Sequence, residues 1–282
     1  MVENRPLANF VSHVILILGV AIVAFPVYLA LVASSSDPTT IANGQLGLLP
    51  EGHLFENYWK VLFEGTERST KQPMIVPLFN SLVMALIIST GKIAISLISA
   101  FAIIYFRFPF RHTAFWVIFI TLMLPVEVRI YPTYKIVADL GMLDTYAGLT
   151  IPLIASATAT LLFRQFFMTV PDELLEASKI DGAGPWMFFK DTLLPLSMTS
   201  IAAMFVIQFI YGWNQYLWPL LITTSDDMQT IVIGIQKMLY VTDALTEWQL
   251  AMATTILAML PPVVVVVLMQ KLFVRGLTET EK

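Results

Sequence analysis

Six long apolar runs dominate the chain and determine its class. Each has about 20 residues or more, the length of helix that crosses a hydrocarbon layer. Strands of a membrane barrel would be shorter and would alternate apolar and polar residues, so the runs predict helices. We therefore expect an all-α integral membrane protein with six transmembrane helices. The expected spans are residues 11–33, 77–106, 114–132, 147–168, 199–223 and 248–273.

The composition agrees with a membrane protein. The chain is 57% hydrophobic and 13% charged, with a mean hydropathy of +0.76, whereas a soluble domain is about half apolar and a quarter charged. The first run is too long for the core of a signal peptide, and no A-x-A-like cleavage site follows it, so we interpret it as an uncleaved span. The chain has no cysteine, which excludes disulfides and thiolate metal sites, and its histidines are far apart.

The distribution of Lys and Arg predicts the orientation. Cytoplasmic loops of membrane proteins carry an excess of these residues. Here they concentrate in the N-terminus, in the connections after the second and fourth runs, and in the tail, while the other loops are richer in acids. We expect a multi-pass protein of the inner (cytoplasmic) membrane with both termini in the cytoplasm. The residues that indicate this are Arg5, Arg107, Arg111, Arg164, Lys179, Lys190, Lys271, Arg275 and Lys282.

Two segments are expected on the outer side. Residues 34–76 are rich in Ser, Thr, Gly and Pro, and residues 53–63 within them have the pattern of a short amphipathic helix. Packing on the outer face, contact with a partner and a plain surface loop remain open for that helix. Residues 224–247 form the second outer segment, with another short helix.

The cytoplasmic segment 169–197 is the most informative. Thr169 and Asp172 have the spacing of a capping box, so we expect a short helix that runs to about Asp181. Gly182 is a natural stop because helix ends often need a left-handed residue. A second helix should start at Pro185, since proline suits a first turn, and end at Pro195. Two short angled helices with one polar face suit insertion into a groove of another protein.

This segment resembles the coupling loop, or EAA loop, of ABC importer permeases. The family pattern is Glu-Ala-Ala, three residues, Gly, nine residues, and Ile-x-Leu-Pro. The chain has Glu176-Ala-Ser178, then Asp181-Gly-Ala183, then Thr192-Leu-Leu-Pro195, so Ser178 and Thr192 depart from the pattern.

The resemblance extends through all six spans and is to type I, carbohydrate-type permeases. It implies an N-terminal helix and periplasmic loop (1–76), a type I transmembrane domain (77–272) that includes the coupling loop (169–197), and a cytoplasmic tail (273–282). Within the family, stretches such as 119–132, 143–150 and 209–219 resemble permeases of glycerol 3-phosphate importers. The implied function is therefore import of sn-glycerol 3-phosphate, and of glycerophosphodiesters as a further option, by alternating access. The alternative is a neutral sugar or oligosaccharide.

The resemblance also implies partners. These are a homologous permease subunit in a heterodimer, two copies of a cytoplasmic ATPase that binds ATP and Mg, and a periplasmic substrate-binding protein, with membrane lipid around the spans and no nucleic acid. This chain would bind no cofactor or metal and would not be an enzyme. The residues expected to couple it to the ATPase are Glu176, Ala177, Ser178, Asp181, Gly182 and Ala183.

Polar residues inside the spans are candidates for the translocation pathway. In the second span, small and hydroxyl residues share one helix face with Lys92, at spacings of three and four. Such a face suits helix contact or a water-filled path, and a charge at this depth costs roughly 2.5–3.5 kcal/mol on insertion scales, so it usually faces a cavity. An ion pair with a partner subunit and a snorkelling side chain remain open for Lys92. The pathway candidates are Ser89, Lys92, Ser96, Gln208, Tyr211, Asn214 and Gln215.

Two charged residues at the end of the third span form a separate candidate. Glu127 and Arg129 follow Pro125, where they would form part of an outer gate or a binding-protein contact. An interfacial ion pair is the alternative. For Gln208 and its neighbours, too, hydrogen bonds between helices are an alternative to a pathway.

The sequence lacks an ATP-binding loop. The pattern G-x-x-x-x-G-K-[ST] is met only at Gly91 and Lys92, because Leu86 replaces the first glycine and Ile93 the final hydroxyl residue. A secondary transporter without an ATPase is a distant alternative. Such folds often show an inverted internal repeat, which we do not find, and the coupling loop would then have no purpose.

Overall fold

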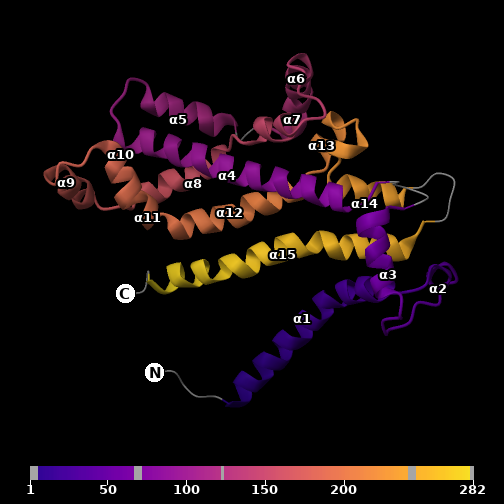
Figure 1. Cartoon of the computed structure of the whole chain (residues 1–282). Helices are drawn as coiled ribbons and strands as arrows, with labels where there is room; N and C mark the ends of the chain where they lie inside the picture. Colours follow the sequence, from indigo (N-terminus) through magenta and orange to yellow (C-terminus); the bar gives the residue numbers. More distant parts are fainter. Residues whose placement is uncertain (1–5, 67–71, 122–123, 241–245, 280–282) are drawn as a thin grey trace. The chain divides into compact units, whose positions relative to one another are not determined.

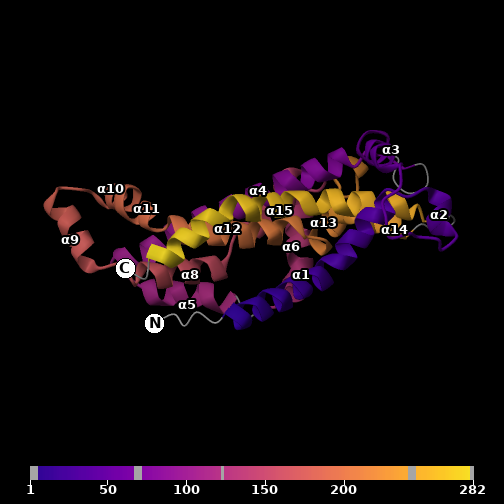
Figure 2. The same cartoon turned by 90° about the horizontal axis from the view of Figure 1, so that it is seen from below.

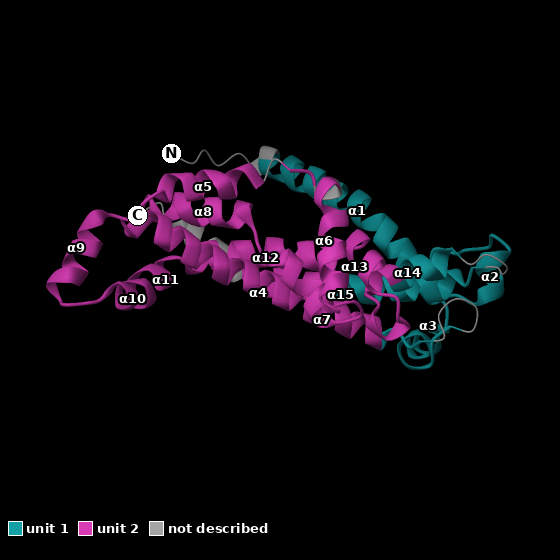
Figure 3. Ribbon diagram, turned by 90° about the horizontal axis from the view of Figure 1, so that it is seen from above, with its two compact units in different colours: residues 1–75, 234–260 teal, residues 76–233, 261–282 magenta. Residues whose placement is uncertain are grey.

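Helices and turns make up the part of the chain that the structure describes. The structure is a computed structural model, and it describes residues 6–66, 72–121, 124–240 and 246–279. Two compact units are present: unit 1 contains residues 1–75 and 234–260, and unit 2 contains residues 76–233 and 261–282 (Figure 3). Arg5 and Lys282, which entered the orientation argument, lie outside the described residues.

Unit 1 contains the first predicted span. The most apolar stretch of this helix buries nothing within the chain, so its side chains are available to lipid. The elements of unit 1 are α1 (Pro6–Ser34), α2 (Pro38–Ala42), α3 (Leu54–Trp59) and the π-helical turn η1 (Lys60–Glu64), with parts of α14 (Ile231–Leu239) and α15 (Trp248–Glu279).

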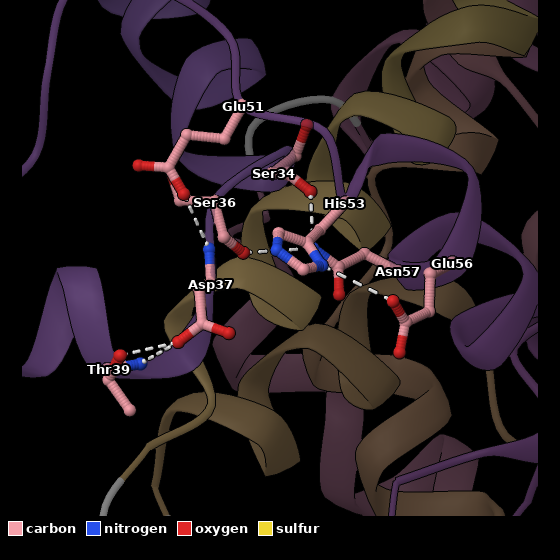
Figure 4. A network of polar contacts seen from close by, with 8 residues as sticks. All are labelled: Ser34, Ser36, Asp37, Thr39, Glu51, His53, Glu56 and Asn57. Atoms are coloured by element: carbon pink, nitrogen blue, oxygen red, sulfur yellow. Dashed lines mark hydrogen bonds and ion pairs between the residues drawn. The ribbon is translucent and has the colours of Figure 1, made fainter.

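A polar network ties the outer segment to the end of α1 (Figure 4). The buried Asn57 of α3 donates from Nδ2 to the carbonyl oxygens of Ser34 (3.0 Å) and Ser36 (3.1 Å). The carboxylate of Glu51 accepts the backbone N–H of Asp37 at 2.9 Å. The amphipathic helix predicted in residues 53–63 is thus confirmed as α3 and η1, and it packs on the chain rather than forming a plain surface loop.

Asp37 shows why α2 begins where it does. Its carboxylate accepts the backbone N–H of Thr39 at 2.8 Å, and Pro38 occupies the first turn, a normal combination for a helix start. Hydrogen bonds from the hydroxyl and backbone N–H of Thr39 lower the pKa of Asp37.

Unit 2 carries the remaining elements. In Figures 1 and 2, α4 runs beside α8 and α12, and the segment around α9 and α10 lies at the end of unit 2 where α4 ends. The elements are α4 (Ile75–Tyr105), α5 (Arg111–Ile120), α6 (Val126–Asp139), α7 (Tyr146–Thr150), η3 (Ile151–Leu153), α8 (Ala157–Phe167), α9 (Asp172–Ile180), α10 (Pro185–Phe188), η4 (Phe189–Leu193), α11 (Leu194–Leu196), α12 (Met198–Trp213), α13 (Leu217–Ile222) and η5 (Asp226–Met228).

Three of the predicted spans are continuous helices, in α1, α4 and α15. Two further membrane-length segments are bent pairs: α7 and η3 join α8 at 47°, and the α10–α11 segment joins α12 at 72°. Their apolar composition predicted spans, but Pro152 within η3 and the cap that Ser156 gives to α8 interrupt the first of them. The membrane-length segments of this chain are therefore partly broken helices.

Two predicted spans have internal interruptions that apolarity alone did not reveal. The run 199–223 forms α12 and α13, separated at residues 214–216. The run 114–132 forms α5 and the start of α6, and residues 122 and 123 between them lie outside the described part. The short helix expected in residues 224–247 is confirmed as α14.

Candidate functional site

The face of α4 predicted from sequence is buried. Ser81, Ala85, Ser89, Lys92 and Ser96 are each at most 6% exposed. Small side chains let neighbouring helices approach closely. At Gly212 of α12, an added Cβ would lie 3.0 Å from the Cα of Ala85, so α4 and α12 are in near-backbone contact.

Lys92 lies inside this contact with two partners from α12. Its Nζ donates to Oε1 of Gln208 at 3.1 Å and lies 3.6 Å from the centroid of the Tyr211 ring. The amide and the face of the ring both stabilise a cation. Gln208 lies 116 positions from Lys92 in the sequence.

The site carries positive charge that no described carboxylate neutralises. Among the described residues, no ion pair involves Lys92. Arg129 on α6 is exposed. A buried cation without a described carboxylate makes a local field that attracts an anion.

The other pathway candidates are distributed more widely. The hydroxyl of Ser89 donates to the carbonyl of Leu86 at 3.1 Å, and that of Ser96 donates to the carbonyl of Ser156 at 3.3 Å. These two serines are buried between helices, in the geometry of helix contact.

The remaining candidates of the fifth span lie in the break after α12. The Nε2 of Gln215 donates to the carbonyl of Tyr211 at 3.1 Å, and Asn214 is exposed. The structure thus brings together Lys92, Gln208 and Tyr211, with Gln215 one helical turn from Tyr211. Glu127 lies on α6, and its side chain is outside the described part.

Sequence reasoning missed a polar cluster at the other end of α4. Asn80 donates from Nδ2 to the carbonyls of Asp227 (2.8 Å) and Gln229 (2.9 Å), and the hydroxyl of Tyr146 donates to its Oδ1 at 2.6 Å. A lone amide in an apolar run was the available signal, because a buried amide needs partners.

Asp144 holds the same loop from another side. Its carboxylate accepts the backbone N–H of Thr224 (2.7 Å) and Ser225 (2.9 Å) and the Thr224 hydroxyl. These bonds, led by the one from Ser225, lower the pKa of Asp144. Together with Asn80, this carboxylate fixes residues 224–229.

Residues 169–197, which resemble a coupling loop and are called the coupling segment below, contain the predicted pair of helices and the predicted stop between them. α9 ends at Ile180, and Gly182 has a φ of +76°. The N–H of Ala183 bonds to the carbonyl of Ser178 (2.9 Å) and that of Gly182 to Lys179 (3.0 Å), the pattern of a Schellman end. The turn between α9 and α10 therefore depends on a left-handed residue.

One local prediction for this segment is wrong. The residue before α9 is Pro171, and the hydroxyl of Thr169 donates back to Phe166 at 2.7 Å, so no capping box forms. The acids of the first turn favour the helix start instead, through its dipole. The helical stretch that begins at Pro185 ends at Leu196, one residue after the predicted Pro195, and α12 begins at Met198 after a bend of 72°. As the second residue of α11, Pro195 occupies a position where its missing N–H costs no hydrogen bond.

Aromatic contacts connect the coupling segment to α4. Phe101 lies 4.9 Å from Phe189, and Tyr105 lies 5.3 Å from Phe188, between ring centroids. Phe188 and Phe189 are buried in the same core cluster as Phe101. Packed rings transmit displacement because such interiors are dense and yield little.

The opposite face of the coupling segment is open. Glu176 and Asp181 are exposed, as are Ile180 (86%) and Trp186 (65%). Among the described residues, neither carboxylate forms an ion pair. Exposed apolar side chains flanked by carboxylates mark a surface for a protein partner.

Known proteins resemble this chain over its whole length. The family described as binding-protein-dependent transport system inner membrane component matches residues 92–279. The chain is 60% identical to the sn-glycerol-3-phosphate transport system permease protein UgpE of Agrobacterium fabrum and to that of Brucella melitensis, and 55% identical to that of Escherichia coli O157:H7, each over 282 residues and 100% of both chains.

One solved structure shows the same fold. It is described as the crystal structure of a bacterial ABC transporter involved in the import of the acidic polysaccharide alginate. One of its chains superposes with a TM-score of 0.80 and 18% identity, covering 96% of this chain and 98% of that chain.

Proposed function

Because the chain belongs to the family of binding-protein-dependent transport system inner membrane components, we propose that it is the membrane-spanning permease subunit of an ATP-driven importer of sn-glycerol 3-phosphate. The observation that carries this proposal is identity of 55–60% over the full length to permeases named for that substrate. The buried, unneutralised ammonium of Lys92 supports it, because a phosphate monoester would supply the missing anion.

In the proposed mechanism, Lys92 and Arg129 attract the phosphate while amide and hydroxyl groups near them bind the glycerol. The candidate pathway is Lys92, Gln208 and Tyr211, with Asn214 and Gln215 at the adjacent helix break. Ser89 and Ser96 then serve the helix contact that positions Lys92. Arg129 lies on α6 next to Glu127, where the two would form part of an outer gate.

Energy enters through the coupling segment. The exposed residues of α9 and its following turn dock onto a cytoplasmic ATPase, which binds ATP and Mg, with Glu176 as the principal contact. Movement of this segment passes through Phe188 and Phe189 to α4, which carries Lys92. Alternating access would follow because the helix that binds the anion is the helix that the motor displaces. The chain itself would then be no enzyme.

The complete machine contains further subunits. A homologous permease would form a heterodimer with this chain, two ATPase copies would bind on the cytoplasmic side, and a periplasmic binding protein would deliver the substrate. Both termini would be cytoplasmic and the protein would lie in the inner membrane. The proposed division is residues 1–76, the transmembrane domain 77–272 with its coupling loop 169–197, and the tail 273–282.

Transport by the reconstituted complex tests the substrate. Vesicles that contain the full complex and binding protein are given labelled glycerol 3-phosphate or maltose, with and without internal ATP. We expect ATP-dependent uptake of the phosphate ester alone. Maltose uptake would replace the proposed substrate with a neutral sugar, and gradient-driven uptake by the isolated chain would refute the importer itself.

A charge reversal tests the coupling role. Glu176→Lys should leave the subunit folded and inserted while ATP hydrolysis no longer drives uptake. The matched control is Glu64→Lys, at an exposed carboxylate of η1. Normal uptake in the Glu176 variant would remove this residue from the docking surface.

A further inference from the structure

A pocket lined by two cationic side chains lies between the end of α4 and the α9–α10 turn, apart from Lys92. Its volume is about 250 Å³. Its lining is Phe101, Tyr105, Phe106, Arg107, Leu175, Ser178, Lys179, Ala183, Gly184, Pro185 and Phe188. We propose that this pocket binds the headgroup of an anionic phospholipid from the cytoplasmic leaflet.

The charge of the pocket selects an anion. Arg107 and Lys179 line it, and no carboxylate does. Among the described residues, neither cation forms an ion pair. Ser178 adds a hydroxyl donor, so one phosphodiester would receive a guanidinium, an ammonium and a hydroxyl, the donors that phosphates prefer.

The apolar part of the pocket selects a lipid over a free ion. Its walls contain Phe101, Tyr105, Phe106 and Phe188. A small hydrated anion has no apolar surface to place against aromatic walls, whereas a lipid has. Ligand pockets for drug-sized molecules measure roughly 300–1,000 Å³. This smaller pocket therefore fits a headgroup and the first carbons of its chains, with the rest of the lipid remaining in the bilayer.

The position agrees with the edge of a membrane. The apolar span in α4 ends at Tyr105, and in the adjoining connection Phe106 and Phe108 flank Arg107 in sequence. Phe106 and Phe110 are 42% and 80% exposed. Aromatic rings gather at the membrane interface, and basic pockets on the cytoplasmic side suit anionic headgroups.

A lipid bound there would regulate coupling. It would contact α4 through Phe101 and α9 through Leu175 and Lys179, so it would join the two elements that must move together. This inference does not depend on which substrate the importer carries. We expect ATP hydrolysis to be more tightly linked to uptake when anionic lipid is present.

Native mass spectrometry of the whole complex from nanodiscs tests the proposal. The nanodiscs contain phosphatidylglycerol and phosphatidylcholine, and the readout is phosphatidylglycerol retained per complex. Arg107→Gln and Lys179→Gln should each weaken retention about fivefold, the effect of one cation near an anionic surface. Arg111→Gln and Lys190→Gln are the matched controls, because both residues lie on the same segments outside the pocket. They should retain the lipid as the wild type does.

Three outcomes would overturn the proposal. These are unchanged retention in both pocket variants, equal loss in both controls, and displacement of the lipid by millimolar inorganic phosphate, which would identify a site for the free ion. If Arg107→Gln does not assemble, Arg107→Lys serves instead and should keep most of the retention. The importer function is tested separately: the wild-type complex is placed in vesicles of the same lipids, and its uptake of labelled glycerol 3-phosphate is measured.

Discussion

Replacement of Lys92 by Met separates a substrate-binding lysine from a structural one. The variant removes an ammonium that is 6% exposed and keeps most of the side-chain volume. It also removes the hydrogen bond to Gln208 (3.1 Å) and the contact with the Tyr211 ring (3.6 Å). The two roles predict opposite changes in transport and stability.

The magnitude follows from burial. A hydrogen bond to a charged group contributes about 1.5–3 kcal/mol, which corresponds to a fall of about 10–150-fold in transport rate if Lys92 binds the phosphate. Stability should change little, because the ammonium costs roughly 2.5–3.5 kcal/mol at membrane depth and its loss offsets the bonds that disappear. Lys135→Met is the control, since Lys135 is an exposed lysine 3.8 Å from Asp139 and surface pairs contribute little.

The assay combines uptake with thermal unfolding. Labelled glycerol 3-phosphate uptake is measured in vesicles at saturating binding protein, alongside ATP hydrolysis and the melting temperature of the purified complex. A low uptake rate at an unchanged melting temperature is the expected result. Normal uptake with a lowered melting temperature would refute the reasoning, because Lys92 would then only hold α4 against α12.

Three further substitutions have defined outcomes. Gly182→Ala places a side chain at a φ of +76°, so it should lower the unfolding free energy by about 1 kcal/mol and weaken coupled ATP hydrolysis. The control Gly52→Ala, with open space around its Cβ, should be neutral in both assays. Gly212→Ala forces α12 from the α4 backbone and should destabilise by roughly 1–3 kcal/mol in a thermal melt; no loss would mean that the helices separate freely. Asp144→Asn should speed amide exchange in residues 224–225 at pH 7. The pKa of Asp144 is lowered in the folded protein, so its carboxylate stabilises this loop fully at pH values above the ordinary pKa of an aspartate. That stabilisation is lost as the pH falls through the lowered pKa. The exchange rates of wild type and variant should become equal only below a pH of about 3.9. Equal rates at pH 7 would show that the charge of Asp144 is not needed to hold the loop.

Local chemistry made much of this protein predictable. An apolar run of membrane length has few alternatives to a helix, and the stop at Gly182 follows from the conformational freedom of glycine. The coupling segment could be predicted for the same reason, since its helices, its turn and its exposed carboxylates lie within one short stretch of sequence. The capping box at Thr169 failed because the hydroxyl had a nearer acceptor in Phe166.

Contacts between distant segments were beyond the sequence. Asn80 bonds to carbonyls 147 and 149 positions away, and nothing in the local pattern identifies those carbonyls. The breaks near Ser156 and at residues 214–216 were also hidden, because mean apolarity does not record where helix axes must turn to pack.

The sequence by itself predicted membrane-spanning helices, a segment with the pattern of a coupling loop, and a lysine on a small-residue helix face. Only the tertiary structure decided that Lys92 meets Gln208 and Tyr211, and that the rings of Phe188 and Phe189 reach the same helix. Helix formation and end geometry depend on neighbours along the chain. The choice of partner for a buried polar group depends on which helices pack together, and that is settled by the three-dimensional fit of all of them.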